Sequence, residues 1–332
     1  MNHPSSSSRA PSSQGASASD IRADAWVLRL APAGARPYLR LARLDRPIGT
    51  WLLLFPGWWA IALGDAYGGD AAANGGPSWW LYLYFGLGAV LMRSAGCVVN
   101  DILDRDIDGK VARTAARPIP AGEVSLTQAG LFLLVLLLAS FAILVQMNTL
   151  TVAMGCASLL LVFPYPLMKR ITYWPQAWLG LTFNWGALIG WTAATGTLAW
   201  PPLLLYLAGI AWTLGYDTIY GHQDKEDDLL VGVKSLALRL DAFGKPWFAL
   251  IYSVTVALFG AAGWATGLLW PFWIGLAAVA AQFAWQVRDV DLDDPANCRA
   301  KFKSNRFVGW LLLAGILGGS PWVHDWIRGL AG

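Results

Sequence analysis

Residues 100–108 place four aspartates directly after an apolar run that is long enough for a membrane helix. Asn100, Asp104 and Asp108 stand at successive four-residue steps. If the helix continues through them, their side chains share one face and Asp101 lies at its edge. Carboxylates this close repel one another unless a cation neutralises them, and oxygen ligands suit Mg²⁺, which usually shares its shell with substrate phosphates. The spacing indicates a magnesium-phosphate site; the alternative is a solvated acidic helix end.

A second acidic cluster follows another apolar run and spans residues 217–228. In it, Asp224 and Asp228 again stand four residues apart. The topology predicted below puts both clusters on one side of the membrane. Two acidic helix ends that meet at the mouth of a helical bundle would hold metal ions against a diphosphate. Because the two clusters support each other, we favour metal-diphosphate binding over solvated helix ends.

Several basic residues are candidate phosphate ligands. Arg113 and Arg117 follow the first cluster, four residues apart. Lys169 and Arg170 end a later apolar run. Guanidinium and ammonium groups at these places would reach a phosphate bridged by the metal ions. The alternative is ordinary anchoring at the basic side of a membrane, a role that we assign to three other residues: Lys245, Lys301 and Lys303.

Arg93 differs from these residues because it lies inside an apolar run, seven residues before Asn100. Seven residues make two helical turns, so the two side chains share a face about 10 Å apart. An arginine at this depth is costly unless it faces the interior and meets an anion. Arg93 therefore marks a binding site, and its partner is either a substrate anion or the aspartates themselves.

The composition is that of a membrane protein. The chain has 332 residues, of which 56% are hydrophobic and 14% charged, with a mean hydropathy of +0.46, whereas soluble domains carry about 25% charged residues. Its 20 Trp residues fit helices with interfacial aromatic belts. A net charge of +3 is too small to indicate nucleic acid as a partner. Neither zinc-ligand spacing nor a disulfide framework is shown by the three cysteines, Cys97, Cys156 and Cys298.

Nine apolar runs come close to the length of a membrane span, which is about 20 residues. We therefore expect an all-α membrane protein in which these runs form a bundle. The predicted spans are about 48–66, 79–99, 126–147, 149–167, 175–195, 199–219, 247–267, 270–288 and 307–327.

Basic residues set the predicted orientation, because Lys and Arg are retained on the cytoplasmic side of a membrane. With nine spans, the N-terminal residues and every second connection lie on one face. With Arg93 counted here although it lies within the second span, this face holds every Lys and Arg of the chain except Arg328. Both aspartate clusters are therefore predicted to face the cytoplasm, or the equivalent matrix side of an organelle.

Residues 1–37 are rich in Ser, Ala and Pro and have no apolar run long enough to span a membrane. We predict a disordered tail there, followed by a single intramembrane domain at 38–332 that begins with a short amphipathic segment. A cleavable organelle-targeting peptide is the alternative for residues 1–19, which contain Arg9 and no acid.

Three stretches carry a resemblance to a known family: GCVVNDILDRDIDGKVARTAARPIPAG at 96–122, YPLMKRITYWPQ at 165–176 and DTIYGHQDKEDDLLVGVKS at 217–235. They resemble the UbiA superfamily of intramembrane prenyltransferases. YPLMKR and DTIYGHQ narrow the resemblance to the branch that prenylates 4-hydroxybenzoate in ubiquinone biosynthesis. LDRPIGTW at 44–51 and SNRFVGW at 304–310 agree, so the resemblance runs from about Arg40 to the last residue.

The resemblance implies a bundle of nine transmembrane helices around a central cavity, with a polar cytoplasmic cap and a lateral opening toward lipid. The implied holders of Mg²⁺ and the allylic diphosphate are Asp104, Asp108, Asp224 and Asp228, adjoined by Asn100 as a further metal ligand and by Asp101. The family's YxxxK pattern falls on Tyr165 and Lys169, and the implied diphosphate ligands are Lys169, Arg113 and Arg117. Arg93 falls where the aromatic carboxylate is expected. Gly221 departs from branches of the family that carry a further acid at this position.

The implied reaction is an electrophilic aromatic substitution. Magnesium and cationic side chains take up charge on the departing diphosphate, and the ring carbon ortho to the phenol attacks the allylic cation. The proton acceptor is an aspartate or the released diphosphate. The implied partners are a polyprenyl diphosphate, 4-hydroxybenzoate and the lipid bilayer. The bilayer is needed because each buried CH₂ of the prenyl chain is worth about 0.8 kcal/mol.

Two other functions are alternatives. Within the family, the acceptor would be a naphthoate or a haem or chlorophyll precursor. From another class, the chain would be an ion-coupled transporter that uses intramembrane acids, although the sequence shows no inverted repeat. We place the protein in a bacterial inner membrane with its active site toward the cytoplasm; the mitochondrial inner membrane is the alternative.

Overall fold

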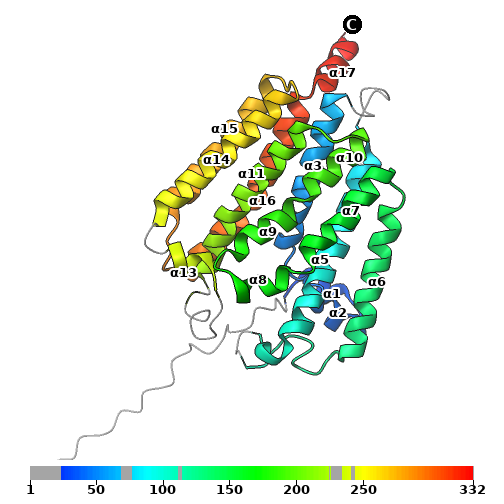
Figure 1. Ribbon diagram of the computed structural model, residues 1–332, viewed down its shortest axis with the longest axis vertical. Coiled ribbons are helices and arrows are strands. Elements are labelled where there is room, and N and C mark those ends of the chain that lie inside the picture. Colours follow the sequence, from blue (N-terminus) through cyan, green and yellow to red (C-terminus); the bar gives the residue numbers. More distant parts are fainter. Residues whose placement is uncertain are drawn as a thin grey trace, which may run out of the picture. The chain divides into compact units, whose positions relative to one another are not determined.

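The computed structural model describes residues 24–68, 77–110, 114–223, 225, 234–240 and 244–331. Every regular element in these ranges is a helix (Figure 1). The chain divides into two compact units. The first holds Met1–Arg46 and Ser94–Leu134, and the second holds Pro47–Arg93 and Val135–Gly332.

The first unit is built on the short helices α1 (Trp26–Leu30), η1 (Ala33–Ala35) and α2 (Arg36–Leu41), with the later part of α5 (Trp79–Asp108) and the start of α6 (Leu126–Leu144). The ring of Tyr38 meets the ring of Phe132 edge-on, with 5.3 Å between centroids. Arg40 forms an ion pair with Glu123. These contacts tie α2 to the start of α6.

The start of α6 is capped by its own side chains. The backbone N–H of Gln128 donates to Ser125 Oγ at 3.2 Å, and the backbone N–H of Ser125 donates to Gln128 Oε1 at 2.9 Å. This reciprocal capping box satisfies two backbone donors at the helix N-terminus. The position at which α6 begins is therefore set by its local sequence.

The prediction of a disordered tail as far as residue 37 does not describe residues 26–35. These residues form α1 and η1. Leu28 of α1 is buried, so an apolar contact orders a stretch whose composition resembles that of a linker. Most of the predicted tail lies outside the described residues.

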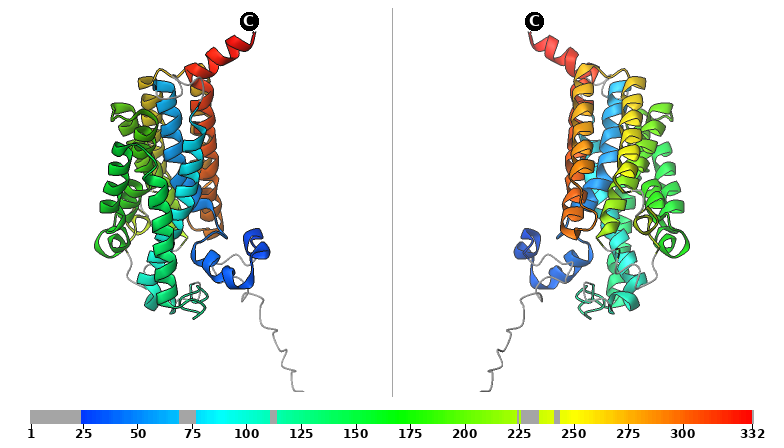
Figure 2. Two further views of the ribbon diagram at one scale, coloured as in Figure 1. Left: turned by 90° about the vertical axis from the view of Figure 1, so that its right-hand side faces the viewer. Right: turned by 90° about the vertical axis from the view of Figure 1, so that its left-hand side faces the viewer.

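The second unit is a bundle of long helices. At its centre, α3 (Ile48–Tyr67) packs against α10 (Gly186–Thr195) and α16 (Pro295–Gly319). Beside it, α11 (Trp200–His222) packs against α9 (Pro175–Asn184) and α14 (Gly244–Ala265). Helix α15 (Trp270–Asp289) lies alongside α14 and α16 (Figures 1 and 2). The remaining helices of this unit are α7 (Thr149–Val162), α8 (Tyr165–Ile171), α13 (Leu236–Leu240) and α17 (Pro321–Ala331).

Aromatic side chains form the centre of this bundle, and two of its tryptophans donate hydrogen bonds to α16. Trp59 and Trp212 are fully buried, with 5.2 Å between their ring centroids. The indole N–H of Trp59 donates to the carbonyl oxygen of Gly309 at 2.9 Å, and that of Trp212 donates to Asn305 Oδ1 at 2.8 Å. A buried tryptophan is favourable when its N–H is satisfied in this way, so these bonds fix how α3 and α11 meet α16.

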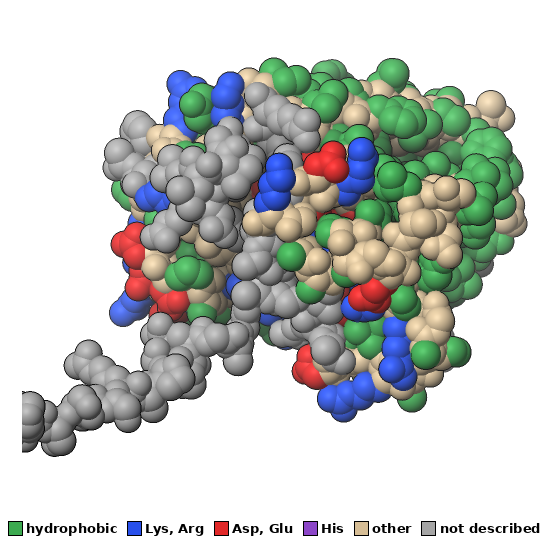
Figure 3. Space-filling view, turned by 90° about the horizontal axis from the view of Figure 1, so that it is seen from below, with side chains coloured by type: hydrophobic (Ala, Val, Ile, Leu, Met, Phe, Trp, Pro, Cys, Tyr) green, Lys and Arg blue, Asp and Glu red, His purple; other side chains and the backbone are tan. Residues whose placement is uncertain are grey.

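Four helices in the described part of the chain are long and apolar enough to cross a membrane: Trp79–Asp106, Leu126–Leu144, Thr149–Met168 and Gly244–Ala265. Large apolar side chains are exposed along one of them, including Leu131, Leu134, Leu138 and Phe141 of α6. The face drawn in Figure 3 also carries extensive hydrophobic surface beside charged side chains. These features are those of a helical membrane protein, and the full set of nine spans stays a prediction.

The bounds of several predicted spans differ from those of the helices. The run at 175–195 is divided into α9 and α10. The run at 149–167 covers α7 and the start of α8, and the candidate span Thr149–Met168 agrees with it. The last predicted span, 307–327, crosses the end of α16 at Gly319 and the start of α17 at Pro321. Helix α16 begins at Pro295 because Asp294 accepts the N–H of Ala296 at 2.8 Å, which caps the helix ahead of its apolar part.

Candidate active site at the end of helix α5

Helix α5 runs without a break through the acidic stretch and ends at Asp108. The condition on which the face shared by Asn100, Asp104 and Asp108 depended, a helix that continues through residues 100–108, is therefore met. Asp101 and Asp108, two turns apart, are both buried, whereas Asp104 is half-buried and Asp106 is exposed. Asp101 therefore lies beside Asp108 on a buried part of the helix surface.

The end of a helix is an unfavourable place for acids. The C-terminus of a helix carries partial negative charge from its last carbonyl groups, which adds to the repulsion between the aspartates. Burial makes this worse, because a buried carboxylate must be paired to remain charged. The cations that pair with these acids are therefore central to the site.

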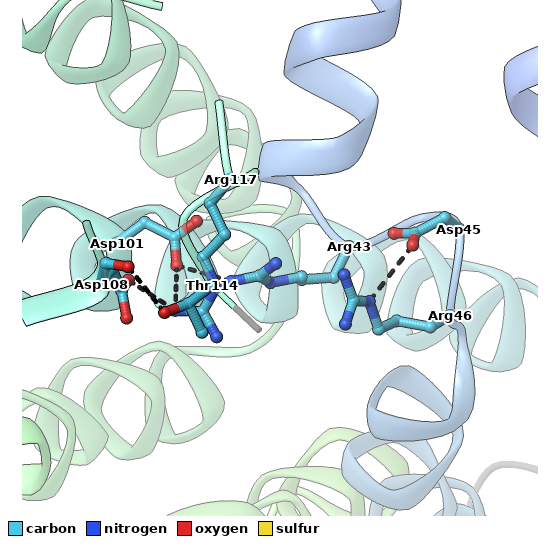
Figure 4. Close-up of polar contacts among 7 residues, drawn as sticks. All are labelled: Arg43, Asp45, Arg46, Asp101, Asp108, Thr114 and Arg117. Carbon is cyan, nitrogen blue, oxygen red and sulfur yellow. Dashed lines mark hydrogen bonds and ion pairs between the residues drawn. The ribbon is translucent and has the colours of Figure 1, made fainter. Parts of the chain in front are cut away.

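Arg117 supplies positive charge to both buried aspartates (Figure 4). Its Nη1 donates to Asp108 Oδ2 at 2.6 Å and lies 3.3 Å from Asp101 Oδ1. The turn that carries Arg117 is fixed to the helix end, because Thr114 Oγ1 donates to the backbone oxygen of Asp108 at 2.9 Å. Arg117 was predicted as a phosphate ligand, and the structure places it against the acidic cluster.

Arg43 supplies the second cation, and it was not predicted as a site residue. Its Nη2 donates to Asp101 Oδ1 at 2.6 Å, and the side chains are 10% and 0% exposed. The two residues are 58 positions apart in sequence. The available signal was a basic residue next to an amphipathic segment, which is also the pattern of an ordinary membrane anchor.

The backbone at Arg43 is unusual. Arg43 has a φ of +57°, the only positive φ among the described non-glycine residues. The backbone N–H of Leu44 donates to the carbonyl oxygen of Leu39 at 3.0 Å. The backbone N–H of Arg43 donates to the carbonyl oxygen of Arg40, also at 3.0 Å. This pattern is a Schellman motif, whose left-handed position is usually glycine. A side chain there costs roughly 1–2 kcal/mol.

The donor set of this helix end fits magnesium. Asn100, Asp104 and Asp108 offer only oxygen ligands from successive turns of one helix. One or two carboxylates together with water and substrate phosphates is the usual Mg²⁺ arrangement. Within the described ranges, no group of three or more His, Cys, Asp or Glu side chains is arranged to hold a metal ion by itself. The helix end therefore suits a site that substrate phosphates complete.

The predicted second cluster, Asp224 and Asp228, lies outside the described residues, as does Arg113. The residues on either side of the second cluster are described and anchored. Gln223 Oε1 accepts from Arg299 Nε at 3.2 Å, and Gln176 Oε1 accepts from the backbone N–H of Leu236 at 3.2 Å. The contact between the two aspartate clusters stays a prediction.

The other predicted site residues lie in the second unit. Arg93 of α5 packs against Gly49 of α3 so closely that a Cβ on Gly49 would lie 2.5 Å from Arg93 Nε. Tyr165 begins the short helix α8, and Lys169 follows one turn later. The side chains of Lys169 and Arg170 lie outside the described part of the structure.

One predicted membrane anchor proves to be a buried residue. The side chain of Lys301 is 4% exposed, forms an ion pair with Asp289, and lies 4.1 Å from the centroid of the Trp285 ring. The interpretation of Lys301 as an ordinary anchor was therefore wrong. A lysine next to aromatic and acidic neighbours is not distinguishable from a surface lysine by local sequence, because the partners come from a separate helix.

Comparison with known proteins agrees with this architecture and these motifs. Residues 53–313 match the model of the UbiA prenyltransferase family. The chain is 50% identical to the mitochondrial 4-hydroxybenzoate polyprenyltransferase of Caenorhabditis elegans, over 86% of this chain and 79% of that protein.

Solved structures share the fold. The apo structure of a UbiA homolog from Aeropyrum pernix K1 matches with a TM-score of 0.66 and 26% identity, over 81% of this chain and 97% of that chain. A UbiA homolog from Archaeoglobus fulgidus bound to GPP and Mg²⁺ matches with a TM-score of 0.53 and 17% identity, over 85% and 99%. The chain belongs to the UbiA prenyltransferase family.

Proposed function

We propose that this protein transfers a polyprenyl group from polyprenyl diphosphate to the ring carbon ortho to the hydroxyl of 4-hydroxybenzoate, with release of diphosphate, in ubiquinone biosynthesis. The observation that carries the proposal is the 50% identity to a 4-hydroxybenzoate polyprenyltransferase over most of both chains. The ion-paired acidic end of α5 supports it, because it offers the carboxylates and guanidinium groups that a diphosphate site needs.

The acidic helix ends would hold the metal. Oxygen ligands would come from Asn100, Asp104 and Asp108 of α5 and from Asp224 and Asp228 of the second cluster. When bound, Mg²⁺ would neutralise charge that develops on the leaving diphosphate. The metal proposal rests on this chain's own donor set, and the fold shared with an archaeal homolog solved with GPP and Mg²⁺ is consistent with it.

The cationic side chains would orient and stabilise the leaving group. Arg117 would donate hydrogen bonds to phosphate oxygens, since a guanidinium has five N–H donors and can serve several acceptors at once. Arg113, Lys169 and Arg170 would add positive charge on the same side. As the C1–O bond of the prenyl group breaks, these donors would stabilise the diphosphate more strongly than they stabilise the bound substrate.

Arg93 would bind the carboxylate of the aromatic acid. An arginine within an apolar helix needs an anionic partner, and a bidentate contact would fix the ring so that the carbon ortho to the hydroxyl faces C1 of the prenyl group. The ring carbon then attacks the allylic cation, and an aspartate or the released diphosphate accepts the ring proton. The surrounding apolar helices would keep water from the cation.

We further propose nine membrane spans around a central cavity, with a polar cap on the side that holds the basic residues. The bilayer would be the inner membrane of a mitochondrion or of a bacterium. The C. elegans relative is named as mitochondrial, which favours the mitochondrial alternative over the bacterial inner membrane that we preferred from sequence. Cysteine-accessibility mapping of the predicted connections in sealed vesicles would test the span count and the orientation.

The direct test is an assay of the purified protein in nanodiscs with MgCl₂, a polyprenyl diphosphate and 4-hydroxybenzoate. The expected product is 4-hydroxybenzoate prenylated next to its hydroxyl, identified by mass spectrometry and NMR. Product only with a naphthoate, or with a haem or chlorophyll precursor, would move the assignment to another acceptor. Full turnover by Asp104→Ala and Asp224→Ala would refute the proposed role of these aspartates in the reaction. No prenylated product with any acceptor would refute the enzyme and favour an ion-coupled transporter.

A further inference from the structure

Arg43 occupies a backbone position that glycine would fill without strain. It is the left-handed residue of the Schellman motif that ends α2, with a φ of +57°. Strained residues persist where the surrounding structure holds them, and they cluster at functional sites. The backbone itself therefore gives no reason for an arginine here, and the reason must lie in the contacts of its side chain.

The side chain of Arg43 begins a row of four alternating charges, which we call the arginine–aspartate row: Arg43, Asp101, Arg117 and Asp108 (Figure 4). Arg43 Nη2 lies 2.6 Å from Asp101 Oδ1, and Arg117 Nη1 lies 3.3 Å from the same oxygen. Arg117 Nη1 is closer to Asp108 Oδ2, at 2.6 Å. Within this row, the shorter contact of Asp101 is therefore with Arg43, and that of Arg117 is with Asp108.

This division depends on Arg43. The carboxylate of Asp101 is fully buried, so its charge must be compensated by nearby cations. If the guanidinium of Arg43 were removed, Asp101 would draw Arg117 toward itself. Arg117 would then move from Asp108 toward the interior of the cluster and become a poorer donor to any group bound at the helix end.

We propose that Arg43 is a positioning residue for the diphosphate site: acting through Asp101, it holds Arg117 at Asp108, where Arg117 meets the leaving diphosphate. Asp101 is then a bridge between two arginines and does not bind substrate or metal. This inference rests on the proposed function, because it needs Arg117 to contact the diphosphate.

Two substitutions separate positioning from folding. Arg43→Gly removes the guanidinium and suits the left-handed backbone, so the Schellman motif is preserved. Arg43→Gln removes the charge and keeps a side chain. Both should raise the KM for polyprenyl diphosphate, and the Kd for inorganic diphosphate in MgCl₂ measured by calorimetry, about tenfold, as expected for a displaced charged hydrogen bond. The KM for 4-hydroxybenzoate should change less than about twofold.

A compensating change gives the sharpest test. Asp101→Asn in the Arg43→Gln background removes the charge that would attract Arg117. The KM for the diphosphate should therefore fall most of the way back to the wild-type value. Arg40→Gln is the matched control, because Arg40 lies three residues earlier and pairs with Glu123, outside the row. It should leave both KM values and the Kd unchanged.

The outcomes distinguish this inference from the proposed function. If Arg117→Ala leaves the KM and Kd for diphosphate unchanged, the proposed contact between Arg117 and diphosphate is wrong, and the role of Arg43 fails with it. If Arg117→Ala raises both but the two Arg43 variants do not, only the positioning role is overturned. Equal increases in both KM values, or a double variant no better than Arg43→Gln, would also overturn it.

Discussion

Two charged clusters in this protein bury opposite partners of an ion pair. At the end of α5, the carboxylates of Asp101 and Asp108 are buried, and two arginines reach them. At the connection between α15 and α16, the ammonium of Lys301 is buried, whereas the side chain of Asp289 is 55% exposed. Both clusters pair an aspartate with a cation, but the group that is removed from water differs.

The two cations also contact their partners differently. A guanidinium is a planar fork that can serve two carboxylates at once, as Arg117 does with Asp101 and Asp108. An ammonium is a compact charge, and that of Lys301 lies over the face of the Trp285 ring. At the end of α5, a bound ligand could take the place of an arginine as the partner of an aspartate. The lysine is enclosed by the protein's own groups, so we interpret that cluster as structural.

The largest effect is expected from Asp108→Asn. It removes a proposed magnesium ligand and the closest partner of Arg117, so turnover should fall by at least about 100-fold while the thermal transition shows a folded protein. Asp106→Asn is the matched control, because Asp106 lies two residues earlier on the same helix and its side chain is 79% exposed. Equal losses of turnover in both variants would show that burial does not distinguish a catalytically important aspartate from the others.

A smaller effect is expected from Gly49→Ala. The added Cβ would lie 2.5 Å from Arg93 Nε, and the end of a flexible arginine can move away at little cost to folding. The KM for 4-hydroxybenzoate should rise about tenfold because the guanidinium is misplaced, with little change in the KM for the diphosphate. Gly86→Ala on α5 is the control, since its Cβ would meet only Trp58, at 3.9 Å. A rise for the diphosphate alone would place Arg93 with the aspartates.

Lys301→Met should affect stability and leave the reaction unchanged. Methionine keeps most of the apolar stem but loses the ion pair with Asp289 and the contact with the Trp285 ring. We expect a loss of about 1–2 kcal/mol, seen as a fall in Tm of about 1–3 °C in a thermal unfolding assay in detergent. A change in either KM with Tm unchanged would contradict the structural role of this cluster.

The smallest effect is a dependence of stability on pH at the same cluster. The hydrogen bond from Lys301 and its positive charge lower the pKa of Asp289 below its ordinary value of 3.8. A lowered carboxyl pKa gives stability that is complete above the ordinary pKa and is lost as pH falls through the folded-state pKa. The difference in Tm between the wild type and Asp289→Asn should therefore be constant from pH 7 to about pH 5 and shrink below the ordinary pKa. A difference that grew on acidification would contradict this sign.

Much of the site was predictable because it depends on spacing along one helix. The four-residue steps of Asn100, Asp104 and Asp108 place them on one face if the helix continues, and α5 is continuous there. Arg117 was predicted because it closely follows the cluster in sequence. Arg43 and Lys301 were not recognised, because their partners lie on separate elements and a basic residue beside an apolar run also describes a surface anchor. The end of the tail was misjudged for a related reason, since residues 26–35 gain order from packing.

The sequence by itself determined that this is a helical membrane protein, how the aspartates are spaced and to which family the chain belongs, because these properties depend only on composition and on the local order of residues. Only the tertiary structure decided which aspartates are buried and which arginine each one meets. Asp101 can be buried because Arg43, at the end of α2, forms an ion pair with it and compensates its charge. Whether a charge can be buried depends on partners that are distant in sequence and are brought together only by folding.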